Sequence, residues 1–250
     1  MTGKALNLTT AIFLLGLSCS VSAMQRFQSG ENRVNVLELY TSEGCSSCPP
    51  ADRYLSDLTD DNRLWKELIP LAFHVDYWDY LGWKDRFSSA IYSNRQRRYA
   101  RENGLSTVYT PGFILNGSEW RSFFGLRKLS LVTDIRTGNL SASVNGNTIQ
   151  LTFDNSITGL KHPIANIAVL GFGIVTEVKR GENSGKNLTH DFTVLGYKTM
   201  EMQSSADGFS LKTQLPDVSV SSPRMGVAVW VNEQGSQVPV QATGGWIDGS

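Results

Sequence analysis

The sequence lacks several features that would assign a function directly. It carries no net charge, with 23 basic and 23 acidic side chains, so no overall electrostatic field draws it to nucleic acid or to an anionic membrane. It contains three cysteines and three histidines, and Cys45 with Cys48 is the only closely spaced pair, whereas a closed zinc site takes two such pairs. Repeats and low-complexity tracts are absent, and a hydrophobic content of 40% excludes a disordered or fibrous chain. Function must therefore come from a local site.

The sequence also lacks an uninterrupted apolar run of about 18 residues, the length that crosses a bilayer. Residues 1–23 instead combine Lys4, a short apolar stretch and a small-residue end, which is typical of a secretory signal peptide cleaved before Met24. We therefore expect a periplasmic or secreted protein with no stable membrane span. Lipid attachment at Cys19 is the alternative, and Gly16 disfavours it because a larger aliphatic residue is expected there.

Removal of the signal leaves a single pair of cysteines, Cys45 and Cys48. A structural disulfide gains stability with the logarithm of the loop that it closes, and a Cys-x-x-Cys loop is close to the minimum. A stabilising cross-link therefore explains this pair poorly. Two thiols at this spacing are instead typical of a redox-active loop or of a site for a soft metal.

Residues 24–138 alternate apolar runs with amphipathic segments, as expected for an α/β domain. A strand, a helix that contains the cysteine pair and a second strand predict a right-handed unit with two parallel strands. An apolar strand after Pro111 and an Asn-Gly turn follow. The pattern predicts strands at 34–40 and 71–75 and helices at 45–58, 87–102 and 125–136. The arginines of the second helix, Arg95, Arg97, Arg98 and Arg101, are expected on a solvated face.

Residues 139–250 consist of short alternating runs separated by turns, which predicts an all-β, antiparallel, sandwich-like domain. The runs are 140–144, 148–153, 164–178, 181–185, 188–197, 209–215 and 225–231. No redox or metal-binding pair lies in this half, and His162 and His190 stand as isolated residues. We expect this half to be a candidate for recruiting or orienting a partner.

The cysteine pair, the later Thr110-Pro111 and the Asn-Gly turn occur in the order found in thioredoxins, and residues 34–137 resemble the thioredoxin superfamily. The resemblance implies an α/β thioredoxin-like domain with a central mixed sheet flanked by helices. It implies that Cys45 attacks substrate disulfides, that Cys48 resolves the mixed disulfide, and that Pro111 lies in a cis-proline loop beside them. The sequence departs from thioredoxin itself in having Gly44 before the first cysteine.

Four longer strings are similar to an exported bacterial thioredoxin-like family catalogued as domain of unknown function 1223. They are GCSSCPPAD, FHVDYWDYLGWKD, YTPGFILNG and RGENSGKNLTHDFTV. This similarity extends over most of the mature chain. It implies a fold and a topology, and it supplies no substrate.

Glu38 lies seven residues before Cys45 in the first predicted strand, near the place where thioredoxins carry a buried acid. A carboxylate buried there suits a proton acceptor for the resolving thiol. The alternative is a structural ion pair with an arginine such as Arg33 or Arg63. Both interpretations stay open at the level of sequence.

The aromatic segment after the second strand offers further candidates. Trp78 and Trp83, together with Thr110, are candidates for substrate binding, and the alternative for the aromatic residues is core packing. His74 with the two cysteines is a candidate copper site, and a hydrogen-bonding role for His74 is the alternative.

These observations predict an exported thiol–disulfide oxidoreductase that exchanges disulfides with protein or small thiol partners through Cys45 and Cys48. The Cys45–Cys48 disulfide is itself the expected redox centre, and no separate cofactor is expected. Two other functions remain open. One is a copper-binding or copper-delivery module, and the other is a non-catalytic thioredoxin-like interaction protein.

Overall fold

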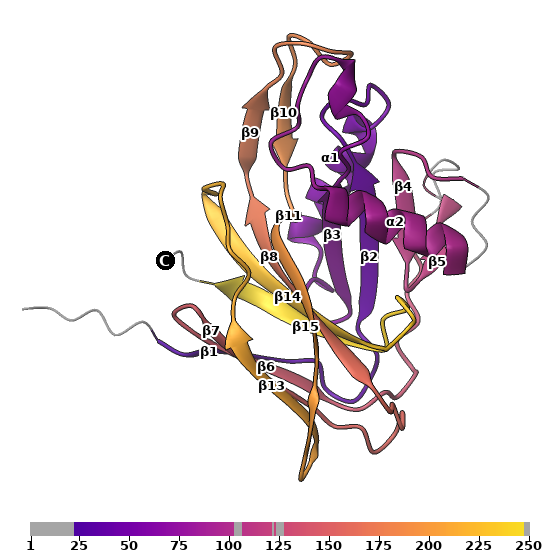
Figure 1. Cartoon of the computed structure of the whole chain (residues 1–250), viewed down its shortest axis with the longest axis vertical. Helices are drawn as coiled ribbons and strands as arrows, with labels where there is room; N and C mark the ends of the chain where they lie inside the picture. The colour runs from indigo at the N-terminus through magenta and orange to yellow at the C-terminus, as the bar shows by residue number, and fades with distance from the viewer. Residues whose placement is uncertain (1–22, 103–106, 122, 124–127, 248–250) are drawn as a thin grey trace, which may run out of the picture.

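The computed structural model describes residues 23–102, 107–121, 123 and 128–247. Cys19 and the rest of the expected signal up to residue 22 lie outside this part of the chain. The described chain is mostly β-structure in several sheets with antiparallel pairing (Figure 1). Its helices are α1 (Pro49–Asp57), α2 (Ala90–Glu102), and the 3-10 turns η1 (Leu58–Asp60) and η2 (Asp79–Leu81). Its strands are β1 (Gln25–Gln28), β2 (Asn35–Thr41), β3 (Leu68–His74), β4 (Gly112–Leu115), β5 (Ser118–Glu119), β6 (Leu140–Asn145), β7 (Thr148–Phe153), β8 (Pro163–Phe172), β9 (Ile174–Glu177), β10 (Asn187–His190), β11 (Thr193–Glu201), β12 (Gln203–Ser205), β13 (Gly208–Gln214), β14 (Arg224–Glu233) and β15 (Gln241–Ile247).

An eight-stranded mixed sheet, in the order β15-β14-β8-β11-β3-β2-β4-β5, runs through the molecule. Strands β2 and β3 are parallel and are joined through α1, and β4 is antiparallel to β2. Every residue of β2 and of β3 is buried, which matches apolar sequences covered on both faces of a sheet. The predicted strand–helix–strand unit around the cysteines is confirmed.

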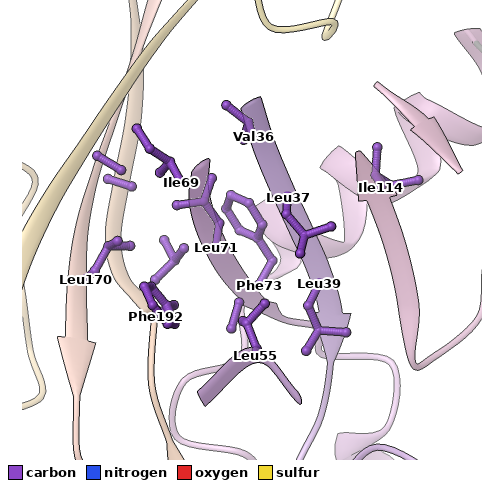
Figure 2. Packing of buried hydrophobic residues seen from close by; sticks show 14 of the residues in the cluster. Val36, Leu37, Leu39, Leu55, Ile69, Leu71, Phe73, Ile114, Leu170 and Phe192 are labelled. Atoms are coloured by element: carbon purple, nitrogen blue, oxygen red, sulfur yellow. The ribbon is translucent and has the colours of Figure 1, made fainter. Parts of the chain in front are cut away.

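The two helices lie on opposite faces of this sheet. Because side chains alternate along a strand, Leu37, Leu39 and Thr41 point to one face of β2, and Glu38 and Tyr40 point to the other. Glu38 contacts α2 through hydrogen bonds, so that face carries α2. Figure 2 shows the apolar residues of β2 and β3 with Leu55 of α1 among them, all members of one buried cluster.

A five-stranded sheet, in the order β1-β6-β7-β13-β12, covers part of the eight-stranded sheet. Its inward residues, such as Leu151 and Phe153, form a second core with Ile167 of β8 and Val229 of β14. The antiparallel strands expected in the second half of the chain are confirmed. Figure 1 shows these strands below the part of the molecule that contains α1 and α2.

Strands from both sides of the expected domain boundary at residue 138 share sheets. β11 lies beside β3 within the eight-stranded sheet, through the pair Thr193 and Ala72. In the other direction, β1 from the first half pairs with β6 from the second. The division of the chain into domains at 24–138 and 139–250 stays a prediction.

The expected helix at 125–136 is wrong in its described part. Residues 125–127 lie outside the described residues, and residues 128–135 form neither helix nor strand. Their carbonyl groups bond to the segment before β2 and to the first residue of β2: Arg33 N donates to Ile135 O at 2.8 Å, and Asn35 Nδ2 donates to Val132 O at 3.1 Å. These contacts between distant segments override the helical spacing of the apolar residues.

The expected strand at 181–185 is also wrong, because these residues form turns between β9 and β10. Gly181 and Gly185 have φ values of +77° and +80°, a backbone region that glycine tolerates and a strand does not use. The expected run at 164–178 divides into β8 and β9 at Gly173, where φ is +64°.

Candidate functional site

The cysteine loop, residues 42–48, connects the end of β2 to the start of α1. Cys45 and Cys48 form a disulfide with a Cα–Cα distance of 5.4 Å. Cys48 is the N-cap of α1, and Pro49 and Pro50 fill the first turn, where a missing amide proton leaves no helical hydrogen bond unmade. Cys48 N donates to Cys45 O at 3.2 Å. The sequence thus ends a strand and begins a helix around the two sulfurs.

Both cysteines are completely buried, whereas the two serines between them are exposed. Cys45 and Cys48 have 0% relative exposure. The hydroxyl of Ser47 lies 3.4 Å from Cys45 Sγ. A partner therefore meets the serines first, and it reaches the sulfurs only after neighbouring groups move.

The predicted substrate-binding residues gather beside this loop. The Thr110-Pro111 peptide bond is cis, the isomer that the resemblance implies. Trp78 Nε1 donates to Thr110 Oγ1 at 2.7 Å. A Cβ added to Gly44 would lie 3.2 Å from Trp78 Cβ, so the absence of a side chain at Gly44 allows this tryptophan to approach the loop. The aromatic segment thus lies beside both the cysteine loop and the cis-proline loop.

Trp83 joins the same site through a different residue. Its Nε1 donates to Glu43 Oε2 at 2.7 Å, and Glu43 lies within the cysteine loop. Trp78 and Trp83 are both partly exposed, and between them Tyr80 is 81% exposed. The segment therefore combines contacts to the loop with an exposed aromatic surface.

Glu38 lies on the α2 face of the sheet, and its partner is an arginine. Arg95 Nε and Nη2 donate to Oε2 and Oε1 of Glu38, each at 2.8 Å, and Tyr99 Oη donates to Oε1 at 2.6 Å. The structural ion pair weighed as an alternative exists, and it uses Arg95 rather than Arg33 or Arg63. Arg95 is 5% exposed, so the expectation that it lies on a solvated face is wrong. The role of Glu38 in proton transfer stays a prediction.

The Glu38–Arg95 pair is enclosed by aromatic side chains. The Arg95 guanidinium lies 5.2 Å from the ring centre of Trp230 and 5.7 Å from that of Tyr197, both from the second half of the chain. Burial, reinforced by the charge of Glu38, holds the pKa values of Tyr40 and Tyr99 well above the ordinary value for tyrosine. This arrangement couples α2 and β2 to β11 and β14.

A second group of charged side chains, all buried except the half-buried Asp52, lies on the α1 side, close to the cysteine loop. We call Glu43, Asp52, His74, Asp85 and His190 the buried ion cluster. His74 Nδ1 lies 2.7 Å from Asp85 Oδ2, and His190 Nε2 lies 3.1 Å from Glu43 Oε1. The rings of His74 and His190 are 5.2 Å apart, so the expectation that His190 is isolated is wrong.

Within this cluster, His74 and Asp85 shift each other's pKa values. Burial alone would lower the pKa of His74, but the charges of Asp85, Asp52 and Glu43 raise it above the ordinary value. Burial would likewise raise the pKa of Asp85, and His74 together with hydrogen bonds from the backbone holds it below the ordinary value. The two groups therefore favour each other's charged forms.

Asp52 connects this cluster to α1. It is the fourth residue after Cys48, and its backbone N donates to Cys48 O at 3.1 Å. Burial raises the pKa of Asp52, and the nearby charges of His190 and His74 act in the opposite direction. An acid on the helix that begins at Cys48 was not predicted from the sequence.

The cluster bears on the copper interpretation. His74 directs Nδ1 to Asp85, and the two sulfurs are joined to each other. Within the described residues, no group of three or more histidine, cysteine, aspartate or glutamate side chains is arranged to hold a metal ion.

In the same part of the chain, no helix has both the length and the apolar content needed to cross a membrane.

The observations define a mostly β protein with a buried disulfide where a strand of a mixed sheet passes into a helix. The chain belongs to the family described as "Protein of unknown function (DUF1223)", whose model matches residues 36–232. Among solved structures, it is similar to protein AGR_C_4864 from Agrobacterium tumefaciens, with 24% identity, a TM-score of 0.59, and coverage of 86% of this chain and 94% of that one. It is also similar to HBP35 of Porphyromonas gingivalis, with 16% identity, a TM-score of 0.54, and coverage of 87% and 76%. No curated protein matches the chain significantly.

Proposed function

We propose that the protein is an exported thiol–disulfide oxidoreductase that acts through Cys45 and Cys48 on protein or small thiol partners. The disulfide between these residues, at the junction of β2 and α1, carries the proposal. The loop that it closes is too short for loop closure alone to account for it as a stabilising cross-link. Redox exchange gives such a pair a purpose.

The arrangement of strands and helices in the first half supports the proposal. Strands β2 and β3 are parallel about α1, β4 is antiparallel to β2, and the helices α1 and α2 lie on opposite faces. Thr110 and Pro111 stand immediately before β4, whose Gly112 pairs with Tyr40 near the end of β2. We propose that this part of the molecule works as a thioredoxin-like domain, with the cis-proline loop beside the sulfurs as the place where a partner chain docks.

In the proposed reaction, the reduced protein gives two electrons to a partner disulfide. Cys45 as a thiolate attacks one partner sulfur, the partner S–S bond breaks, and its second sulfur leaves as a thiolate. Cys48 then loses its proton and attacks Cys45 Sγ, which forms the Cys45–Cys48 disulfide and releases the partner's first sulfur. Cys45 precedes the N-terminus of α1, and the positive end of the helix dipole favours the negative charge on its sulfur. A dithiol partner regenerates the reduced form by the reverse steps.

We propose that the protein works outside the cytoplasm. Strand β1 begins at Gln25, after the expected cleavage site before Met24, so a mature chain retains every described strand. The first residue of protein isolated from cell fractions tests this proposal. Met24 in a periplasmic or secreted fraction would support it, and a cytoplasmic protein that retains residues 1–23 would contradict it.

Trapping of mixed disulfides tests the activity. With Cys48→Ser, the resolving thiol is absent, so partners attacked by Cys45 should remain attached and appear as species that a reductant releases. Cys45→Ser is the matched control, because it retains one thiol and lacks the nucleophile. The absence of trapped species with Cys48→Ser, or equal trapping by both variants, would contradict the proposal.

A further inference from the structure

The turn between β9 and β10, residues 178–186, lies against the cysteine loop although it belongs to the second half of the chain. Asn183 is completely buried, and its Nδ2 donates to two carbonyl oxygens of the loop, Glu43 O at 2.8 Å and Cys45 O at 2.9 Å. Strand β10 also contacts α1, and Figure 1 shows the two side by side. Because this buried side-chain amide donates to two carbonyl groups of the loop, it fixes the backbone around Cys45.

The neighbouring residue of the turn places a negative charge at the same loop. Glu182 Oε2 accepts a hydrogen bond from Ser46 N at 3.1 Å, and Ser46 directly follows Cys45. Hydrogen bonding with Ser46, through its side chain and its backbone amide, lowers the pKa of Glu182 below its ordinary value, so the carboxylate is charged near neutral pH. Glu182 thus accepts the amide hydrogen bond of the residue that follows the first cysteine.

This placement has opposite consequences for the two redox states. In the disulfide, neither sulfur is charged, and the hydrogen bonds from Asn183 and to Glu182 hold the loop. In the dithiol, Cys45 becomes a thiolate in the loop that precedes α1, where the positive end of the helix dipole favours it. The Glu182 carboxylate takes up the amide of Ser46 and repels the thiolate. Lys186 Nζ donates to Asn183 Oδ1 at 2.9 Å, so the positive charge of Lys186 lies at the oxygen end of the Asn183 side-chain amide.

We propose that the turn between β9 and β10 sets the redox equilibrium of the cysteine pair, with Glu182 and Asn183 as positioning residues that favour the disulfide over the dithiol. The proposal rests on the thiol–disulfide exchange proposed above, and it assigns a role to the second half of the chain. In the exchange that measures it, two glutathione thiols give two electrons to the disulfide. The Cys45–Cys48 bond breaks, the two cysteines become thiols, and glutathione disulfide forms.

The test is the equilibrium of the mature chain with reduced and oxidised glutathione, measured for the natural protein and for Glu182→Gln. The substitution retains an acceptor for Ser46 and removes the charge. We expect the equilibrium to move toward the dithiol by roughly two- to fivefold, the size of a charge effect at an exposed helix terminus. The shift should diminish in about 1 M salt, where exposed charges are screened.

The matched control is Glu177→Gln. Glu177 is an exposed acid on the same hairpin, and it lies 3.6 Å from Lys179 rather than at the cysteine loop. This variant makes the same change in net charge, so it should leave the equilibrium where the natural protein has it. Equal shifts in the two glutamine variants, or no shift with Glu182→Gln, would overturn the proposal.

The rate of Cys45 alkylation by iodoacetamide against pH gives a second readout, which needs no partner protein. With Glu182→Gln, the Cys45 thiolate should form at lower pH, and with Glu177→Gln its titration should be unchanged. Asn183→Ala should accelerate reduction by dithiothreitol severalfold, and a rate equal to that of the natural protein would count against a holding role. If the natural protein forms no mixed disulfide with any partner, the proposed function fails, and the alkylation comparison still decides the role of Glu182.

Discussion

Glu38 and Arg95 form the most enclosed ion pair on the α2 face of the sheet, with exposed fractions of 1% and 5%. Removing one charge of a buried pair costs more than the pair contributes, because the remaining charge lies unpaired away from water. We therefore expect Glu38→Gln to lower the free energy of unfolding by about 3 kcal/mol. Urea denaturation of the disulfide form measures it.

The control for this substitution is Glu102→Gln. Glu102 pairs with Arg98 on the exposed side of α2, at 3.3 Å, and such pairs contribute about 0.5 kcal/mol or less. A similar loss in both variants would contradict the structural role of the Glu38–Arg95 pair.

The proton-transfer hypothesis has its own readout: with Glu38→Gln, resolution of the mixed disulfide should slow while alkylation of Cys45 stays nearly unchanged.

The His74–Asp85 pair should make stability depend on pH on two sides. The pKa of His74 is raised, so its contribution is complete below its unfolded value, near 6.5, and is lost as pH rises through the folded value. The pKa of Asp85 is lowered, so its contribution is present above its unfolded value, near 3.8, and is lost as pH falls through the folded value. The pair therefore stabilises most strongly between these two unfolded values.

Asp85→Asn tests this pH window. The difference in unfolding free energy between the natural protein and the variant should be largest near pH 5 and should decrease toward pH 9 and toward pH 2. Asp57→Asn, at an exposed position of α1, is the control and should give a small difference that varies little over this range. A difference for Asp85→Asn that is constant with pH would contradict the ion pair.

Among the elements, the aromatic segment after β3 connects the cysteine loop to the cis-proline loop. Trp78→Phe retains an aromatic ring beside Gly44 and removes the hydrogen bond to Thr110. Loss of one such bond, about 1 kcal/mol, should accelerate reduction of the buried disulfide by dithiothreitol about fivefold. Trp246→Phe, in β15, is the control and should leave the rate unchanged. An unaltered rate with Trp78→Phe would show that this bond does not limit access to the sulfurs.

The elements that sequence predicted correctly are those whose signals are local. β2, α1 and β3 follow from continuous apolar strands and from a proline-containing helix start, which need no distant partner. The helix expected at 125–136 failed because Asn35 and Arg33 take up the backbone of that segment. β15 was not predicted, since its sequence QATGGWI contains two adjacent glycines and few apolar residues.

The site was predictable to the same extent. Cys45 and Cys48 carry a motif at fixed spacing, and Thr110-Pro111 follows it in the expected order. Trp78 links the two, since it lies beside Gly44 and donates to Thr110. Asn183 lies 138 positions from Cys45, and no local pattern marks it as a neighbour. His190 likewise lies beside Glu43 only because the folded chain brings these distant positions together. Charged residues buried by distant strands have no periodicity of their own, so sequence reasoning treated His190 as isolated and Arg95 as solvated.

At the scale of the whole molecule, the eight-stranded sheet makes the two halves of the chain interdependent. Without residues 139–250, β3 would lose β11, and Ala72 N would lose its acceptor, Phe192 O, at 2.8 Å. Trp65 would lose Phe172 and Trp246, which lie 6.4 and 5.4 Å from it between ring centres. A fragment that ends at residue 138 would therefore expose a sheet edge and a large apolar surface.

We expect a fragment of residues 24–138 not to fold cooperatively, although it contains both cysteines and the cis-proline loop. Its unfolding in urea should be broad, and its dispersion in an amide nuclear magnetic resonance spectrum should be narrow beside that of the chain 24–250. The full mature chain is the control under identical conditions. A fragment with a sharp unfolding transition would show that residues 24–138 are an independent domain, and it would contradict the requirement for β11 beside β3. A fragment that fails to fold would mean that the cysteine pair depends on the second half of the chain for its scaffold as well as for the turn at Asn183.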